Sequence, residues 1–172
     1  MSKPNRVYWD SCDYLDFLKG DHPRHDHMAA LLEDWKQGEV IMVTSALTIA
    51  EVLWVRCEKS TLRRMLDRST EQDLAGLFDP PPPAELVIVE LSRTTALAAR
   101  ELVWKHRIKP KDAVHVASAI EGRCDEMHTS DAGLLKHDKK LGGLQPLRII
   151  EPTWERQVPL PFTETDAERR PS

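Results

Sequence analysis

Short apolar runs alternate with amphipathic stretches along the 172-residue chain. Runs rich in β-branched and aromatic residues predict strands, and stretches with apolar residues three or four positions apart predict helices. The predicted strands are 6–10, 40–45, 86–91, 124–130 and 146–152. The predicted helices are 11–18, 27–39, 46–68, 94–107, 109–122 and 131–137, the third of them open to division into two. Because strands and helices alternate, the pattern predicts a parallel sheet flanked by helices.

Glycine and proline residues mark several boundaries of these elements. Gly20 and Gly38 follow predicted helices, where a residue that adopts left-handed backbone angles often ends a helix. Pro110 suits a helical first turn, because the N–H that it lacks is not needed there, and Gly122 suits a helix end. The segment 79–85 contains four consecutive prolines and therefore predicts a loop.

The composition is that of an ordinary soluble domain. Apolar residues make up 41% of the chain and charged residues 30%, and the length suffices for one domain with a buried core. We expect a single domain over residues 5–150. Residues 151–172 form a proline-rich, polar C-terminal extension, which we expect to be ordered only where it docks on a partner.

Charge and cysteine content exclude several classes of protein. The formal net charge is −4, so nucleic-acid binding through a strongly basic overall charge is excluded, and such binding has to come from local patches. Cys12, Cys57 and Cys124 form no CxxC pair, which argues against a disulfide framework or a zinc knuckle. No signal-peptide core and no apolar run of membrane-spanning length is found, so we expect a cytoplasmic protein.

Acidic residues lie where predicted strands end or helices begin. Asp10 ends the first predicted strand, and Glu51 lies on the second turn of the helix that follows the second strand. Asp112 lies in a first helical turn, and Asp131 follows the strand candidate “EMHTS”. In sheets of this class, ligands bind outside the carboxyl ends of the strands. We therefore expect the four side chains to meet at one edge of the sheet.

Each of these acids also has a purely structural explanation. Asp10 and Asp131 could be helix N-caps, and Asp112 could interact with the positive end of a helix dipole. Glu51 lies among apolar residues in “LTIAEVLWV”, where an unpaired charge is costly to bury. Its charge therefore requires a partner cation, a path to solvent or a metal ion.

Four converging carboxylates cannot all ionise at neutral pH without a cation, because they repel one another. Oxygen ligands without Cys or His suit Mg²⁺ or Mn²⁺. Such clusters commonly hydrolyse phosphodiester bonds, since the metal lowers the pKa of a water and stabilises the leaving oxygen. The residues therefore favour a metal-dependent hydrolase.

The order and spacing of the acids resemble those of a known family. Asp10, Glu51 in “LTIAEVL”, Asp112 in “KDAVHVASA” and Asp131 after “HTS” look like the pattern of PIN-domain nucleases, over residues 7–150. The resemblance implies an α/β protein with a three-layer α/β/α, Rossmann-like fold around a central parallel sheet. It also implies that the four acids are catalytic and bind Mg²⁺ or Mn²⁺.

Residues beside the acids follow the family pattern in part. Ser11 matches a hydroxyl residue after the first acid and Thr129 one before the last, and the resemblance implies that both, with Ser130, support the metal ligands. Cys12 stands where family members often have Asn, which changes one supporting contact. Ser130 stands where they often have a further acid, so the number of metals, one or two, stays open.

Within the family, the chain is most similar to the small VapC-type ribonuclease toxins. By this resemblance it cuts a single-stranded or looped RNA segment, forms a homodimer and is blocked by a cognate antitoxin, often through an Arg or Lys that enters the acidic pocket. Two alternatives stay open. One is a catalytically silent PIN-like module that binds RNA or protein. The other is a small-phosphoester hydrolase, although phosphatases of the dehalogenase type need D-x-D where this chain has “DSCD”.

Basic and aromatic residues add further expectations. Lys109, Lys111 and Lys136 flank the acids in sequence and are predicted to contact RNA phosphates, although solvated helix ends explain each of them equally well. The tryptophans Trp9, Trp54 and Trp104 are predicted to be core residues rather than base-stacking residues.

Histidines are interpreted as structural. His22, His25 and His27 in “DHPRHDHM” do not match a zinc-hydrolase motif and predict a polar loop that leads into a helix. His115 lies three residues after Asp112, on the same helix face, but its apolar neighbours favour a packed core position over support of the ligands.

Overall fold

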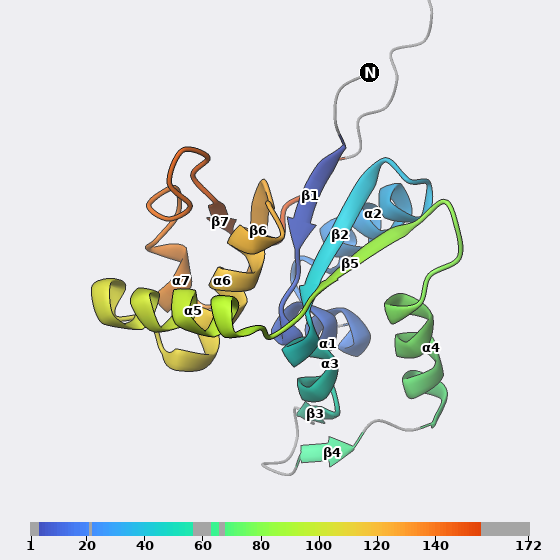
Figure 1. Cartoon of the computed structure of the whole chain (residues 1–172). Helices are drawn as coiled ribbons and strands as arrows, with labels where there is room; N and C mark the ends of the chain where they lie inside the picture. Colours follow the sequence, from blue (N-terminus) through green and yellow to red (C-terminus); the bar gives the residue numbers. More distant parts are fainter. Residues whose placement is uncertain (1–3, 21, 57–62, 66–67, 156–172) are drawn as a thin grey trace, which may run out of the picture.

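A five-stranded sheet forms the centre of the computed structural model, which describes residues 4–20, 22–56, 63–65 and 68–155 (Figure 1). The strand order is β5-β2-β1-β6-β7, and every neighbouring pair is parallel. The strands are β1 (Asn5–Tyr8), β2 (Val40–Ser45), β5 (Glu85–Val89), β6 (Glu126–His128) and β7 (Arg148–Ile150). All five strands therefore end at the same edge of the sheet, which we call the carboxyl edge.

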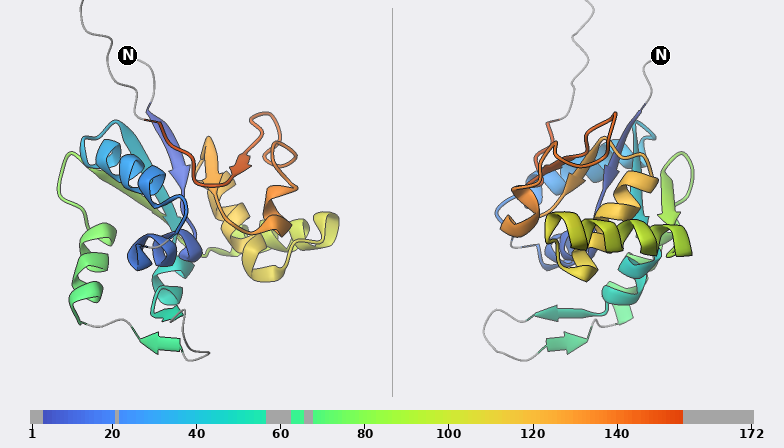
Figure 2. Two further views of the ribbon diagram at one scale, coloured as in Figure 1. Left: turned by 180° about the vertical axis from the view of Figure 1, so that it is seen from behind. Right: turned by 60° about the vertical axis from the view of Figure 1, so that its left-hand side comes forward.

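Helices cover both faces of the sheet (Figure 2). One face carries α1 (Ser11–Lys19), α2 (His25–Lys36) and α4 (Arg68–Phe78). The other carries α5 (Arg93–His106), α6 (Pro110–Glu121) and the short α7 (Ala132–Leu135), and α3 (Ala46–Glu51) projects beyond the end of β2. The predicted three-layer α/β/α arrangement around a parallel sheet is confirmed.

The core consists of two apolar clusters, one on each face of the sheet. Val7 and Trp9 point into the cluster beneath α1 and α2, whereas Tyr8, between them, points into the cluster beneath α5 and α6. Because both faces are buried, the end of β1 and the first four residues of β2 are apolar runs rather than alternating ones. Trp9 is fully buried, as predicted. The core position predicted for Trp104 is wrong, since this residue is 75% exposed, and the side chain of Trp54 lies outside the described part.

Most predicted boundaries are confirmed. Gly20 ends α1 with a φ of 72°, in the left-handed region that favours glycine. Pro110 is the first residue of α6, and Gly122 follows its last turn. The proline segment 79–84 connects α4 to β5 without regular structure, as expected.

The long helix predicted over residues 46–68 is wrong. Among the described residues 46–56 and 63–65, only α3 is helical; it ends at Glu51, and the backbone of Val52 leaves the helical region. It is followed by a small antiparallel hairpin of β3 (Trp54–Arg56) and β4 (Arg63–Met65). The run “VLWV” is rich in β-branched and aromatic residues, which favour extended backbone, and short apolar runs do not distinguish helix from strand by periodicity.

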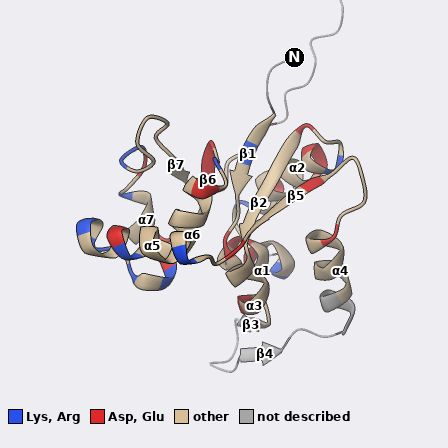
Figure 3. Cartoon of the chain, in the orientation of Figure 1, with Lys and Arg blue, Asp and Glu red and all other residues tan. Residues whose placement is uncertain are grey.

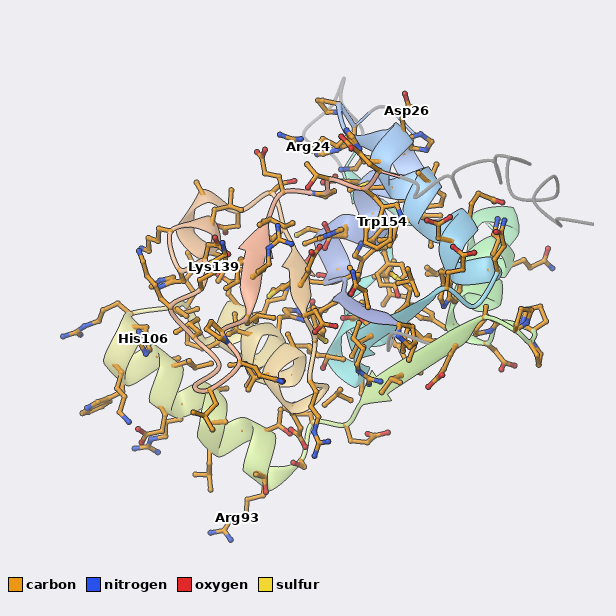
Figure 4. All side chains as sticks on the ribbon, turned by 90° about the horizontal axis from the view of Figure 1, so that it is seen from above. Arg24, Asp26, Arg93, His106, Lys139 and Trp154 are labelled. Carbon is orange, nitrogen blue, oxygen red and sulfur yellow. The ribbon has the colours of Figure 1, made fainter. Side chains whose placement is uncertain are left out.

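The first residues of the C-terminal extension dock on α2. The indole N–H of Trp154 donates to Asp34 Oδ2 at 2.8 Å, and its backbone N–H donates to His27 Nδ1 at 3.2 Å. Glu151 forms an ion pair with Arg24, and Figure 4 shows Arg24 and Trp154 on the side that α2 covers. Residues 151–155 are thus ordered against the domain, and the rest of the predicted extension lies outside the described residues.

No helix in the described part of the chain is both long and apolar enough to span a membrane.

Candidate functional site

The topology brings the predicted acids to the carboxyl edge. Asp10 follows β1 and caps α1, and Asp131 follows β6 and caps α7. Glu51 is the last residue of α3, which extends from the end of β2, and Asp112 lies in the first turn of α6. Figure 3 shows acidic positions in red around this edge, at α1 and α3. The four acids thus follow strands or begin or end helices around this edge, and contacts decide how closely they approach one another.

Asp10 and Asp131 are helix caps, and each keeps an oxygen for another partner. Asp10 Oδ1 accepts from the backbone N–H of Cys12 at 2.7 Å and of Asp13 at 3.3 Å. Asp131 Oδ1 accepts from the backbone N–H of Gly133 at 2.5 Å. Within the described residues, Oδ2 of Asp10 accepts no hydrogen bond, and Oδ2 of Asp131 faces a lysine. Capping therefore does not exclude metal binding at either residue.

Burial concentrates negative charge around Asp10, which is 6% exposed. Desolvation raises the pKa of its carboxyl and Asp112 raises it further, against the opposing influence of His115 and the backbone N–H groups. Asp13 is also buried, and burial together with Asp10 raises its pKa well above the ordinary value. A bound cation would relieve this repulsion and favour the ionised form of Asp10.

Glu51 has the cationic partner that its position required. Lys111 Nζ lies 3.0 Å from Glu51 Oε1, while Ser11 Oγ donates to Oε2 at 2.7 Å. His115 Nε2 lies 3.1 Å from the same Oε2. Burial would raise the pKa of Glu51, but the hydrogen bonds from Ser11, Lys111 and His115 outweigh it and lower the pKa. Glu51 is therefore ionised at neutral pH and held in one orientation.

His115 is buried, but it is more than the packed core residue that the sequence favoured. Its ring is 2% exposed, and its two nitrogens contact Tyr8 Oη at 2.8 Å and Glu51 Oε2 at 3.1 Å. A carboxylate only accepts, so Nε2 donates to Glu51 and Nδ1 accepts from Tyr8, whose pKa is raised by burial and which stays protonated. His115 thus connects the sheet to a predicted metal ligand.

Residues around Asp131 form the outer part of the site. Thr129 Oγ1 accepts from the backbone N–H of Asp131 at 3.2 Å and fixes the turn after β6. Ser130 Oγ lies 3.3 Å from His22 Nε2 and so contacts the loop before α2 rather than another acid. The side chain of Asp131 is 42% exposed, and Lys109 Nζ lies 3.9 Å from its Oδ2.

Two lysines at the start of α6 each approach a different acid of the site. Lys111 pairs with Glu51 at 3.0 Å and Lys109 approaches Asp131 at 3.9 Å, and both flank Asp112 in the sequence “KPKD”. Each lysine is mostly exposed, so its ammonium group is able to leave the carboxylate that it approaches and bind another anion. Lys136, also predicted to contact RNA, is exposed at the end of α7.

The acids fit a hard cation by their chemistry, although they do not enclose a common point. Asp112 raises the pKa of Asp10, while His115 lowers it and contacts Glu51. Among the described residues, no three His, Cys, Asp or Glu side chains are grouped closely enough to hold a metal ion. The donors are carboxylate oxygens with an excess of negative charge at Asp10, as Mg²⁺ and Mn²⁺ prefer.

Sequence reasoning missed Asp13 and Tyr8. Asp13 Oδ2 accepts from the backbone N–H of Asp10 at 3.1 Å, which completes a reciprocal capping box. The spacing “DSCD” carries that signal, because the capping box pairs residues three positions apart. Burial and the neighbouring Asp10 raise the pKa of Cys12 to about 12, so its thiol is protonated in the metal-free protein.

The three histidines at the start of α2 have separate partners; His22 lies in the loop before the helix, and His25 and His27 lie in its first turn. His22 contacts Ser130, His25 stacks on Phe17 with ring centroids 5.2 Å apart, and His27 contacts the backbone of Trp154. The three rings therefore do not converge on a shared zinc site.

We expect Asp10 to destabilise the metal-free protein increasingly as the pH rises. Folding raises the pKa of Asp10. At pH values between the pKa in the unfolded chain and the pKa in the folded protein, the folded protein therefore binds more protons than the unfolded chain, and the contribution of Asp10 to the free energy of unfolding falls as the pH rises. Asp10→Asn removes this titration and keeps the cap, since Asn caps helices as well as Asp does. Urea unfolding is measured in EDTA from about pH 4 to about pH 8. Over this range the free energy of unfolding should fall less for Asp10→Asn than for the wild type. Equal losses would contradict a buried, repelled charge at Asp10.

Comparisons with known proteins agree with this geometry. Residues 7–140 match the domain family described as “PIN domain”. A solved structure described as “Toxin-antitoxin complex from Klebsiella pneumoniae” contains a chain of similar fold, with a TM-score of 0.54 and 19% sequence identity. That match covers 87% of this chain and 99% of the other, and at this identity it shows the fold alone. No curated protein matches significantly. PIN domains are generally nucleases, which are hydrolases.

Proposed function

This chain belongs to the PIN-domain family, and we propose that it is a metal-dependent endoribonuclease that acts as the toxin of a toxin–antitoxin pair. One observation carries the proposal: Asp10 is a buried carboxyl whose pKa is raised by burial and by Asp112, at the sheet edge where His115 contacts the ionised Glu51. Buried negative charge without a compensating cation destabilises a protein, so its retention at a sheet edge supports a functional site.

The roles of the residues follow from their contacts. Asp10, Glu51 and Asp112, with Asp131 at the outer side, would hold Mg²⁺ or Mn²⁺. When bound, the metal would supply an activated water and stabilise charge on the leaving oxygen. Ser11 and His115 orient Glu51, while Thr129 orients the backbone of Asp131, in keeping with the support proposed for Ser11 and Thr129. Ser130 is proposed to support the outer side through the loop that carries His22.

Lys109 and Lys111 have a second task in this proposal. In the metal-free protein they neutralise Asp131 and Glu51. Once a metal neutralises the acids, both ammonium groups become available for RNA phosphates beside the scissile bond, and Lys136 offers a further cation. The exposed position of these lysines supports such an exchange.

Partners are proposed on similar grounds. The PIN-domain match and the fold of the toxin–antitoxin structure support a cognate antitoxin, whose Arg or Lys would enter the acidic site as Lys111 does within this chain. Exposed apolar side chains on or just after α3 and before or within α5 support a homodimer; they are Ile49, Leu53, Leu91 and Leu97. We propose a cytoplasmic location, as expected for an RNA-cleaving toxin.

The proposal is tested by metal-dependent cleavage. After treatment with EDTA, the protein should leave a mixed-sequence single-stranded RNA intact, and added Mg²⁺ or Mn²⁺ should restore cleavage. Products are resolved on a denaturing gel, and p-nitrophenyl phosphate is assayed in parallel. Hydrolysis of that ester without RNA cleavage would instead identify a small-phosphoester hydrolase. Metal-independent RNA binding with no turnover would identify a silent binding module.

A further inference from the structure

Trp104 is a large apolar side chain that the fold leaves exposed. It lies on α5 and is 75% exposed, whereas Leu102 and Val103 of the same helix pack against the core. A tryptophan offers a large flat apolar surface, and its exposure on a soluble domain gives no folding benefit. Such a ring is typical of surfaces that bind a flat or apolar partner.

The surroundings of Trp104 are strongly basic. Residues 100–111 and 132–140 contain eight Lys or Arg and two Asp or Glu, in a chain whose net charge is −4. Figure 3 shows this concentration of blue positions around α5, α7 and the start of α6. Of the cations there, Arg107, Lys136 and Lys139 are exposed and have no ion-pair partner within the described part of the chain.

The two basic segments meet at a pair of histidines. The rings of His106, at the end of α5, and His137, just after α7, meet edge to face with centroids 6.0 Å apart. Figure 4 shows His106 and Lys139 on the same side of the molecule. The basic segments also reach the acidic site, because Lys109, two residues after the C-cap Arg107, approaches Asp131 at 3.9 Å.

We infer that this α5–α7 face, defined by Trp104, Arg107, Lys109, Lys136 and Lys139, binds single-stranded RNA that flanks the cleaved bond. The inference rests on the proposed function. Cations that follow one another along a surface match a phosphate backbone, and an exposed indole beside Arg107, three residues before it on the same helix end, matches an unstacked base. A duplex keeps its bases stacked and offers no free ring to Trp104, so the charge and the indole together favour a single strand.

Binding to a catalytically blocked background measures this surface without cleavage. A labelled single-stranded RNA of about 12 nucleotides, within the range of site sizes for single-strand binding, is titrated with Asp112→Asn protein in EDTA, and fluorescence anisotropy gives Kd. Adding Trp104→Ala should raise Kd by about 5- to 100-fold, the effect of losing one base–aromatic stack. Trp104→Phe should restore most of the affinity, and Lys36→Ala, on an exposed residue near the opposite edge, should leave Kd unchanged.

Three outcomes would overturn the inference. Kd unaffected by Trp104→Ala would exclude stacking, and an equal loss of affinity for double-stranded RNA would show that the ring has no single-strand role. Competition by poly-glutamate with the same dependence on Trp104 would assign the face to an acidic protein partner. Because Trp104 is exposed, both variants should unfold at the wild-type temperature, which circular dichroism checks.

Failure of the proposed function is distinguishable from failure of this inference. If the metal-loaded wild type cuts no RNA while Trp104→Ala still weakens single-strand binding, the nuclease proposal fails and the binding face stands. If Trp104→Ala cuts RNA with the wild-type kcat/KM and binds it with the wild-type Kd, the binding face fails and the nuclease stands.

Discussion

Asp10→Asn and Asp112→Asn should each reduce RNA cleavage by about 10³-fold or more, comparable to the loss of a preorganised electrostatic contact in other enzymes. Both substitutions keep the size and hydrogen-bonding shape of the side chain and remove its charge. At Asp10 the amide oxygen still accepts from the backbone of Cys12 and Asp13, so α1 keeps its cap. Cleavage of a labelled single-stranded RNA in Mg²⁺ or Mn²⁺, followed under single-turnover conditions, measures the effect.

A matched control separates charge at the site from charge in general. Glu39→Gln removes an equivalent charge from an exposed residue just before β2, at the opposite edge of the sheet, and should cut RNA at the wild-type rate. Thermal unfolding should show all three variants folded, with Asp10→Asn at least as stable as the wild type near neutral pH without metal. Wild-type cleavage rates in Asp10→Asn or Asp112→Asn would remove these residues from the reaction.

His115→Ala should weaken Mn²⁺ binding and cleavage by about 10- to 100-fold, as the loss of residues that orient metal ligands commonly does. The substitution leaves Glu51 without its Nε2–H donor and Tyr8 without its acceptor. His115→Gln should recover much of the loss, because a glutamine amide is able to donate to Glu51 and accept from Tyr8. Calorimetric Mn²⁺ titration and kcat are measured together for the two variants.

Val116→Ala is the matched control for the loss of buried volume. Val116 follows His115 on α6 and is fully buried, so its truncation should lower the unfolding temperature without changing Mn²⁺ affinity. If His115→Ala behaves in the same way, with reduced stability and unchanged metal affinity, then His115 is only a packing residue and its role in orienting Glu51 is refuted.

The position of the acids could be predicted because it depends on topology. Alternating strands and helices predict a parallel sheet, and in a parallel sheet Asp10 and Asp131 have to lie at the same edge since each follows a strand. The caps at both residues were also readable, because Asp before a helical stretch is a common N-cap. These inferences need only local pattern and the direction of the chain.

Tertiary partners could not be predicted in this way. Lys111 lies sixty residues from Glu51 in sequence, and only the packing of α3 near α6 makes their ion pair visible. His115 has apolar neighbours in sequence, which conceal a ring that reaches Tyr8 on another element. Trp104 directly follows Leu102 and Val103, and each residue turns about 100° around a helix, so composition alone does not show which side chain faces solvent.

Direct measurement of Mn²⁺ binding to the purified protein tests the central claim most directly. Isothermal titration with Mn²⁺ should give saturable binding to the wild type and to Glu39→Gln, and no measurable binding to the double variant Asp10→Asn/Asp112→Asn, with all three proteins folded. A double variant that binds Mn²⁺ with the affinity of the wild type would contradict the assignment of the metal to these acids.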